Sequence, residues 1–82
     1  MNITKENVGD EVKLRNGLKG IITGFHRWIY EGEKAEQPVF VRLKDVNGWV
    51  FHTEKGENIT DKKSDFDIVE ILDFDAIEIL ED

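Results

Sequence analysis

Five short segments rich in β-branched and aromatic residues recur along this 82-residue chain, at the spacing of about ten residues that is typical of small all-β domains. Asn-Gly, single glycines and polar stretches separate the segments. The region that would form the core shows no sustained helical period. The sequence therefore predicts one all-β domain, a small five-stranded barrel or sandwich, and closing the sheet would hide its strand edges.

The first two segments predict a hairpin. Residues 12–15 alternate with period two and are followed by Asn16-Gly17, the strongest short signal for a type I′ turn, in which both central residues have positive φ. The next segment, residues 20–30, is too long for one flat strand, and Gly24 interrupts it. We expect a bulge or sharp bend at Gly24.

Two further strands are expected at residues 39–43 and 49–53, on either side of a turn at residues 45–48. Pro38 stands at the first position of the earlier strand, where a missing N–H is tolerated. Alternation should direct residues 39, 41 and 43 to the core and turn Phe40 and Arg42 away from it. A polar loop of twelve residues, 54–65, then follows; it is long enough to suspect a function, although a solvated loop remains the alternative.

The last segment contains an internal repeat. Residues 65–72 are followed at once by residues 73–80, and six of the eight positions are identical. Each copy carries the alternation of a half-buried strand, while Phe74, Ile77 and Leu80 in the second copy also fit one face of a helix. We expect residues 1–72 to form the domain and residues 73–82 to form an acidic C-terminal extension, as an additional strand.

Residues 8–25 begin with a Gly-Asp that leads into a first strand, and a later glycine followed by β-branched residues opens a second strand. This pattern resembles the opening of KOW-type and other SH3-like barrels. The resemblance implies an SH3-like barrel fold. Such openings occur in ribosomal and transcription proteins and in small proteins of phages and mobile elements. The chain departs from the nucleic-acid-binding branch because it is acidic and lacks that branch's basic loops, so RNA binding is not carried over as the first choice.

Amino-acid composition indicates where the protein acts and which kind of partner it binds. The chain has no cysteine, no leader-like apolar region at its start and no apolar run long enough to span a bilayer, so we expect a cytoplasmic protein without disulfides. The net charge is −7, and residues 61–82 hold nine acidic residues and two lysines, whereas residues 1–60 hold nine of each sign. A nonspecific phosphate binder would carry the opposite bias.

No motif for catalysis, a metal or a cofactor stands out, and we expect none of the three. His26 and His52 lack a third ligand at a recognisable spacing. Ser64, the only serine, lies in a polar loop without a supporting motif for a nucleophile. The glycines occupy turn and bend positions that are not followed by a helix, so they do not form a phosphate-binding loop.

Aromatic residues are the more informative candidates. Alternation places His26, Trp28 and Tyr30 on one face of the second strand and large side chains on the other face as well, so one of the two faces should be partly exposed. The alternative is that Trp28 and Trp49 cap the two ends of a small core. The partner-binding residues predicted from the sequence are Trp28, Tyr30, Phe40, Arg42, Trp49, Asp73, Asp75, Glu78 and Glu81.

The leading hypothesis is a noncatalytic protein-interaction module. The acidic extension and the neighbouring aromatic residues would occupy a basic site on a host protein, as an accessory protein or inhibitor of a phage or mobile element does, for example an anti-CRISPR or counter-defence protein. The extension could also mediate a homodimer. The competing hypotheses are a KOW-like RNA- or ribosome-associated module that uses Arg27, Arg42 and Lys44 with the aromatic residues, and a binder of a small ligand at the barrel mouth.

Overall fold

The computed structural model describes residues 1–26 and 32–72. This part of the chain is all-β apart from one short 3-10 helix, and none of its helices is long and apolar enough to cross a membrane. Its elements are η1 (Lys5–Asn7), β1 (Glu11–Leu14), β2 (Lys19–Phe25), β3 (Val39–Leu43), β4 (Trp49–His52) and β5 (Ile68–Leu72).

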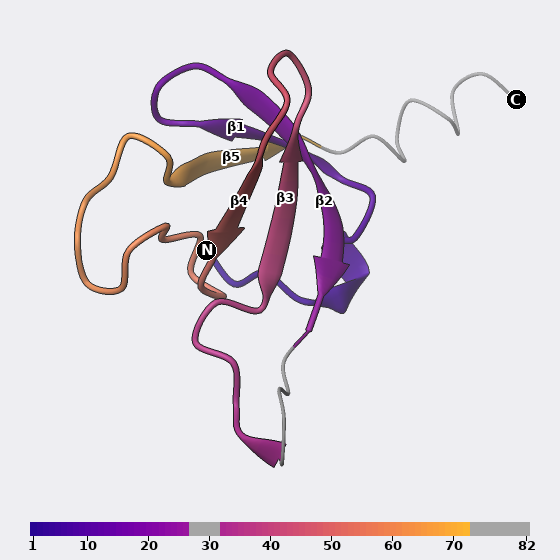
Figure 1. Cartoon of the computed structure of the whole chain (residues 1–82), viewed down its shortest axis with the longest axis vertical. Coiled ribbons are helices and arrows are strands. Elements are labelled where there is room, and N and C mark those ends of the chain that lie inside the picture. Colours follow the sequence, from indigo (N-terminus) through magenta and orange to yellow (C-terminus); the bar gives the residue numbers. More distant parts are fainter. Residues whose placement is uncertain (27–31, 73–82) are drawn as a thin grey trace, which may run out of the picture.

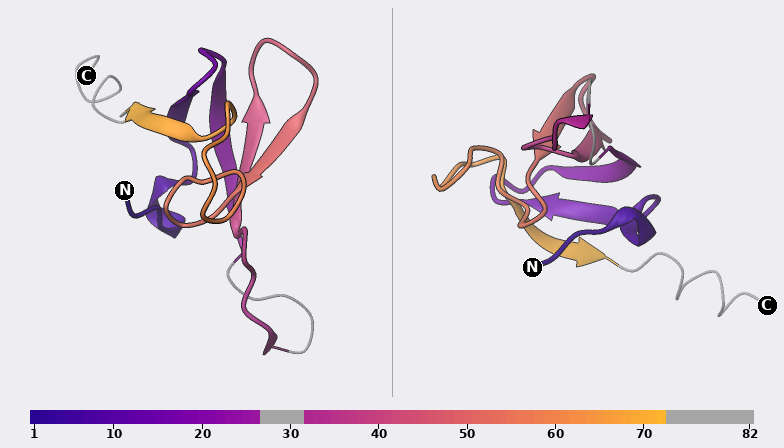
Figure 2. Two further views of the ribbon diagram at one scale, coloured as in Figure 1. Left: turned by 90° about the vertical axis from the view of Figure 1, so that its left-hand side faces the viewer. Right: turned by 90° about the horizontal axis from the view of Figure 1, so that it is seen from below.

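The five strands form one antiparallel sheet in the order β4-β3-β2-β1-β5. In Figure 1, β2, β3 and β4 run side by side and roughly vertically, while β1 and β5 run roughly horizontally. This change of direction across one sheet means that the sheet is strongly curled. The expectation of a closed barrel is wrong: β4 and β5 are the two edges of the described sheet and are not paired with each other. The connection between β4 and β5, orange in Figures 1 and 2, projects beyond the strands.

The β1–β2 hairpin forms where the sequence predicts it, but with a different turn. Gly17 has a φ of 91°, whereas Asn16 is not in the left-handed region. The backbone N–H of Gly17 donates to the carbonyl of Leu14, and the N–H of Leu14 donates to that of Leu18. This is a three-residue loop in which the left-handed glycine forms a bulge. In a loop of this type only the glycine takes positive φ, and here the Asn16 carboxamide oxygen accepts from the Leu18 N–H at 3.0 Å.

The predictions for β2 and β3 are confirmed. The register between these strands shifts between Ile22 and Gly24, which is the bulge expected at that glycine. In β3 the odd-numbered residues are buried, Phe40 is half-buried and Arg42 is exposed. The part of the long second segment beyond His26 lies outside the described residues.

One apolar core lies inside the curled sheet. It takes side chains from all five strands and from the N-terminal segment, whose Ile3 N–H donates to the carbonyl of Glu54 at 2.7 Å. The sheet therefore wraps around its core although its edges do not pair. The core residues are Ile3, Val12, Leu14, Ile22, Val39, Val41, Leu43, Val50 and Ile68.

In β5 the alternation differs from the expected one. Val69 and Ile71 were predicted to share the buried face, but Val69 is exposed while Ile68 is buried and Ile71 packs against the core. The cause is a register shift in the β1–β5 ladder, between Lys13 and Leu14. A bulge inserts one residue and turns it away from the core.

Asp67 organises the long β4–β5 connection. Its carboxylate accepts the backbone N–H groups of Asn58 and Ser64, both at 2.9 Å, and lies 3.3 Å from the guanidinium of Arg15. Burial raises the pKa of this carboxyl, but the two backbone donors and Arg15 outweigh burial and hold the pKa below its ordinary value. Asp67 therefore joins the loop, the β1–β2 turn and the start of β5.

Replacing this carboxylate should loosen the loop and β5 together. We expect Asp67→Asn to lower the free energy of unfolding by roughly 1.5–3 kcal/mol at neutral pH, because hydrogen bonds to a charged acceptor are lost. Urea denaturation would measure the change. The exposed Asp65 supplies the control: Asp65→Asn should change stability by less than about 0.5 kcal/mol. Equal effects of the two substitutions would contradict this role.

His52 connects the two edges of the sheet. It lies at the end of β4 and is fully buried, and its Nε2 lies 2.7 Å from the carbonyl oxygen of Phe66, which precedes β5. Since a carbonyl only accepts, Nε2 carries the proton and donates it. Nδ1 is buried with no hydrogen-bond partner. Burial lowers the pKa of His52 below its ordinary value of 6.5, although Phe66 and Asp67 oppose this change.

A lowered pKa in the folded state makes stability depend on pH with a definite sign. Below about pH 6.5 the unfolded chain takes up a proton at His52 that the folded chain refuses. The free energy of unfolding should therefore fall with decreasing pH, by up to about 1.4 kcal/mol per pH unit. Urea denaturation between about pH 7.5 and 5.5 tests this.

The chain has a second histidine as the matched control. His52→Gln should flatten the pH dependence, whereas substitution of the exposed His26 by Gln should preserve it. A wild-type stability that is constant across this range, or a slope that His26→Gln removes, would refute the role of His52.

Candidate binding face

Alternation on β3 and β4 places four large side chains on the outward face of the sheet. Phe40 lies opposite Phe51 in the ladder, and Arg42 lies opposite Trp49. Trp49 is 55% exposed and Phe51 is 43% exposed, so the alternative in which Trp49 caps the core does not hold. We call these four residues, together with His26, the aromatic face.

Three rings of the aromatic face form a chain of contacts centred on Phe40. The centroids of Phe40 and Phe51 lie 4.9 Å apart in an edge-to-face arrangement, and those of His26 and Phe40 lie 4.7 Å apart. Gly24 makes room for the histidine, because a Cβ atom at that position would lie 2.8 Å from its Nε2. The bulge of β2 therefore shapes this face directly.

A shallow hollow adjoins these rings. Its volume is about 390 Å³, and Phe40, Phe51 and His26 line it together with residues 35–37 of the β2–β3 connection. Apolar carbon makes up most of its surface, and Glu36 and Gln37 supply polar groups. A hollow of this kind suits one apolar or aromatic side chain of a partner.

Three of the nine predicted partner-binding residues are brought together here: Phe40, Arg42 and Trp49. The other six lie outside the described residues: Trp28, Tyr30, Asp73, Asp75, Glu78 and Glu81. Arg27, predicted for the RNA-binding alternative, also lies outside them.

The predicted set omits Phe51 and His26. Phe51 could have been found from its parity with Trp49, which places the two side chains on the same side of β4. The contact of His26 with Phe40 depends on the bulge, so sequence spacing gives no signal for it.

A row of three lysines crosses the same outward face. Lys13 lies directly opposite Lys19 in the β1–β2 ladder, and the Lys44 N–H donates to the Lys19 carbonyl at 2.9 Å. We call these residues the lysine row. Like charges directly opposite each other destabilise a sheet. Two carboxylates moderate the repulsion: Glu70 lies opposite Lys13, and the buried Glu11 pairs with Lys44.

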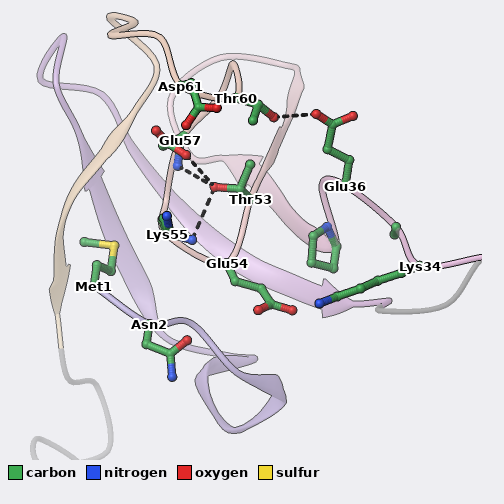
Figure 3. Close-up of a pocket in the computed structure, with 12 residues that line it drawn as sticks. Met1, Asn2, Lys34, Glu36, Thr53, Glu54, Lys55, Glu57, Thr60 and Asp61 are labelled. Carbon is green, nitrogen blue, oxygen red and sulfur yellow. Dashed lines mark hydrogen bonds between the residues drawn. The ribbon is translucent and has the colours of Figure 1, made fainter.

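A larger hollow shares Ala35 and Glu36 with the first and lies between the β2–β3 connection and the β4–β5 loop. It encloses about 640 Å³, and Figure 3 shows the side chains around it. The Thr60 hydroxyl donates to the Glu36 carboxylate at 2.7 Å and ties its two walls together. The Thr53 hydroxyl accepts the N–H groups of Lys55 and Glu57, both at 3.2 Å, and thus shapes the turn at the rim. Its charged lining consists of four carboxylates and two lysine side chains: Glu36, Glu54, Glu57, Asp61, Lys34 and Lys55.

The described residues do not gather the groups needed for metal or nucleophilic chemistry. Within residues 1–26 and 32–72, no three His, Cys, Asp or Glu side chains are placed to hold a metal ion. Ser64 caps the loop, since its hydroxyl accepts the Phe66 N–H at 3.2 Å. His52 donates to the Phe66 carbonyl inside the protein, and the His26 ring contacts Phe40 in the aromatic face.

Comparisons of the chain with protein-family models, with curated proteins and with solved structures find no match. The aromatic face and the lysine row are the features of the described residues that bear on function.

Proposed function

We propose that this chain is a noncatalytic binding module that recognises a protein partner through the aromatic face. The observation that carries the proposal is the exposed cross-strand set Phe40, Phe51, Trp49 and Arg42 on two paired strands. Aromatic side chains and arginine dominate the binding energy of protein interfaces. Strands hold such side chains more rigidly than loops do, which lowers the entropy lost on binding.

The proposal includes an SH3-like fold. Its support is the strand order, in which β1 to β4 form a consecutive antiparallel meander and β5 returns to pair with β1. The KOW-like opening in residues 8–25 contributes β1 and β2 to that meander. The acidic extension, residues 73–82, would be an additional strand under this proposal.

We further propose that the partner carries a basic surface. The net charge of −7 favours such a partner, and the last ten residues contain five carboxylates and no basic side chain. Charge complementarity would speed association and exclude acidic competitors. Occupying a basic site on a host protein is the action of an inhibitor, and small phage or mobile-element proteins of the anti-CRISPR or counter-defence type act in this way.

A second candidate function is binding of single-stranded nucleic acid. The lysine row and Arg42 lie on the same outward face as Trp49 and Phe51. Proteins that bind single strands combine stacking rings with a cationic track for phosphates. The lysine row is the observation that favours this second candidate function. Arg42 and Lys44 would bind the nucleic acid, as the sequence-based hypothesis of an RNA-binding module also predicts.

A comparative affinity capture tests the leading proposal. The double variant Trp49→Ala, Phe51→Ala should capture at least about tenfold less partner than the wild type does, because two large side chains of the interface are removed. The control is Val46→Ala, which removes a side chain that is also exposed, at 47%, but lies in the β3–β4 turn. Both variants should unfold within about 1 kcal/mol of the wild type, because the replaced side chains are exposed.

Salt dependence separates the two candidate functions. Retention of an oligonucleotide by the isolated chain, lost steeply between about 0.05 and 0.2 M salt, would favour the nucleic-acid module. Equal capture of a protein partner by the wild type and the double variant would refute the aromatic face as its binding site.

A further inference from the structure

The negative charge of the chain is concentrated beyond the folded sheet. Residues 1–26 and 32–72 contain twelve acidic and ten basic side chains, so their charges nearly balance. The last ten residues contain five acidic side chains and no basic one. A strongly acidic segment is thus attached directly to a sheet that carries the lysine row.

The acidic segment begins beside that row. Leu72, the last residue of β5, lies opposite Glu11 in the β1–β5 ladder. Glu11 is two residues from Lys13 on the same strand, which corresponds to about 7 Å along the sheet. The described sheet therefore ends two residues beyond Glu70, which lies opposite Lys13 of the lysine row.

A continuous line of paired residues leads from there to the aromatic face. Glu11 lies opposite Ile21, Ile21 opposite Arg42, and Arg42 opposite Trp49. The line from Leu72 to Trp49 crosses four gaps between neighbouring strands, which is about 19 Å at the usual strand spacing. Ten extended residues span up to about 33 Å. The acidic segment is therefore long enough to cross the whole sheet.

We propose that residues 73–82 dock on the outward face of their own chain, across the lysine row and toward Arg42 and Trp49. Lys13, Lys19 and Arg42 offer cations to an extended acidic segment, and this chain carries one directly after β5. Alternate carboxylates of an extended segment lie about 6.5–7 Å apart, and the flexible lysine side chains reach such a spacing. The apolar residues of the segment would cover the half-buried Ile21 and Leu72.

Docking would add carboxylates near Lys13 and Lys19, which lie directly opposite each other and share only Glu70 as a paired carboxylate. A basic partner surface would take the acidic segment, and a polyanion would take the lysine row. The proposal does not depend on the proposed function, because it concerns the isolated chain.

A spin label on the acidic segment tests the proposal. The chain has no cysteine, so Asp82→Cys gives one site for a nitroxide. At about 0.05 M salt the label should reduce the amide NMR signals of Lys19, Arg42 and Trp49 at least twofold, and about 0.5 M salt should restore them. Lys13→Gln with Lys19→Gln should also restore them. Lys44 is kept, because its loss would leave the buried Glu11 without its cation.

The matched control is Lys62→Gln with Lys63→Gln, which removes the same charge from exposed loop positions and should leave the broadening in place. Broadening confined to the neighbours of Leu72, or equally sensitive to both pairs of substitutions, would overturn the proposal. So would broadening that appears when the label and the isotope are on different molecules, since the segment would then dock on a second copy.

Discussion

The hydrogen bonding of the Asp67 carboxylate is the interaction on which the rest of the structure depends. This group is buried, accepts two backbone N–H groups of the long loop, and pairs with Arg15 beside the first turn. The next residue, Ile68, enters the core and begins β5. A buried carboxylate is stable only when it is fully hydrogen-bonded, so its donors fix where the loop ends and where the last strand starts.

Together with Asp67, His52 explains how a sheet with open edges encloses a core. The histidine at the end of β4 donates to the chain just before β5, and the Ile68 N–H donates to the carbonyl of Gly56 at 2.9 Å. These bonds bring the two edges together without pairing them. A chain of this size buries only about 60–65% of its unfolded surface, so each bond at the seam matters for stability.

Much of the fold was predictable from local patterns, because alternation and turn signals act over a few residues. The burial of β3, the bulge at Gly24 and the position of the first hairpin were predicted correctly. The type I′ turn was wrong because the hairpin closes through a three-residue loop, in which Gly17 has positive φ and Asn16 does not. The burial of Val69 was wrong because a bulge depends on pairing with β1, which lies more than fifty residues away in the sequence.

In the candidate site, too, local patterns predicted some residues, whereas features that depend on long-range strand pairing were missed. Phe40 and Arg42 were predicted to face outward from the alternation of their strand, and Trp49 was predicted as a neighbouring aromatic side chain. The lysine row was not predicted, because it exists only through the register of three strands. The structural roles of the buried Asp67 and His52 were not predicted either, because an isolated Asp or His in the sequence does not reveal its hydrogen-bond partners.

The central claim is that the outward face of β3 and β4 touches the partner. Site-specific photocrosslinking tests it most directly, with a photoreactive phenylalanine analogue placed at Phe51 in one sample and at Val46 in another. Both positions are exposed to a similar degree, at 43% and 47%, so only their location differs. The account predicts crosslinks to the partner from position 51 and few or none from position 46. Crosslinks of equal yield from both positions, or from position 46 alone, would contradict it.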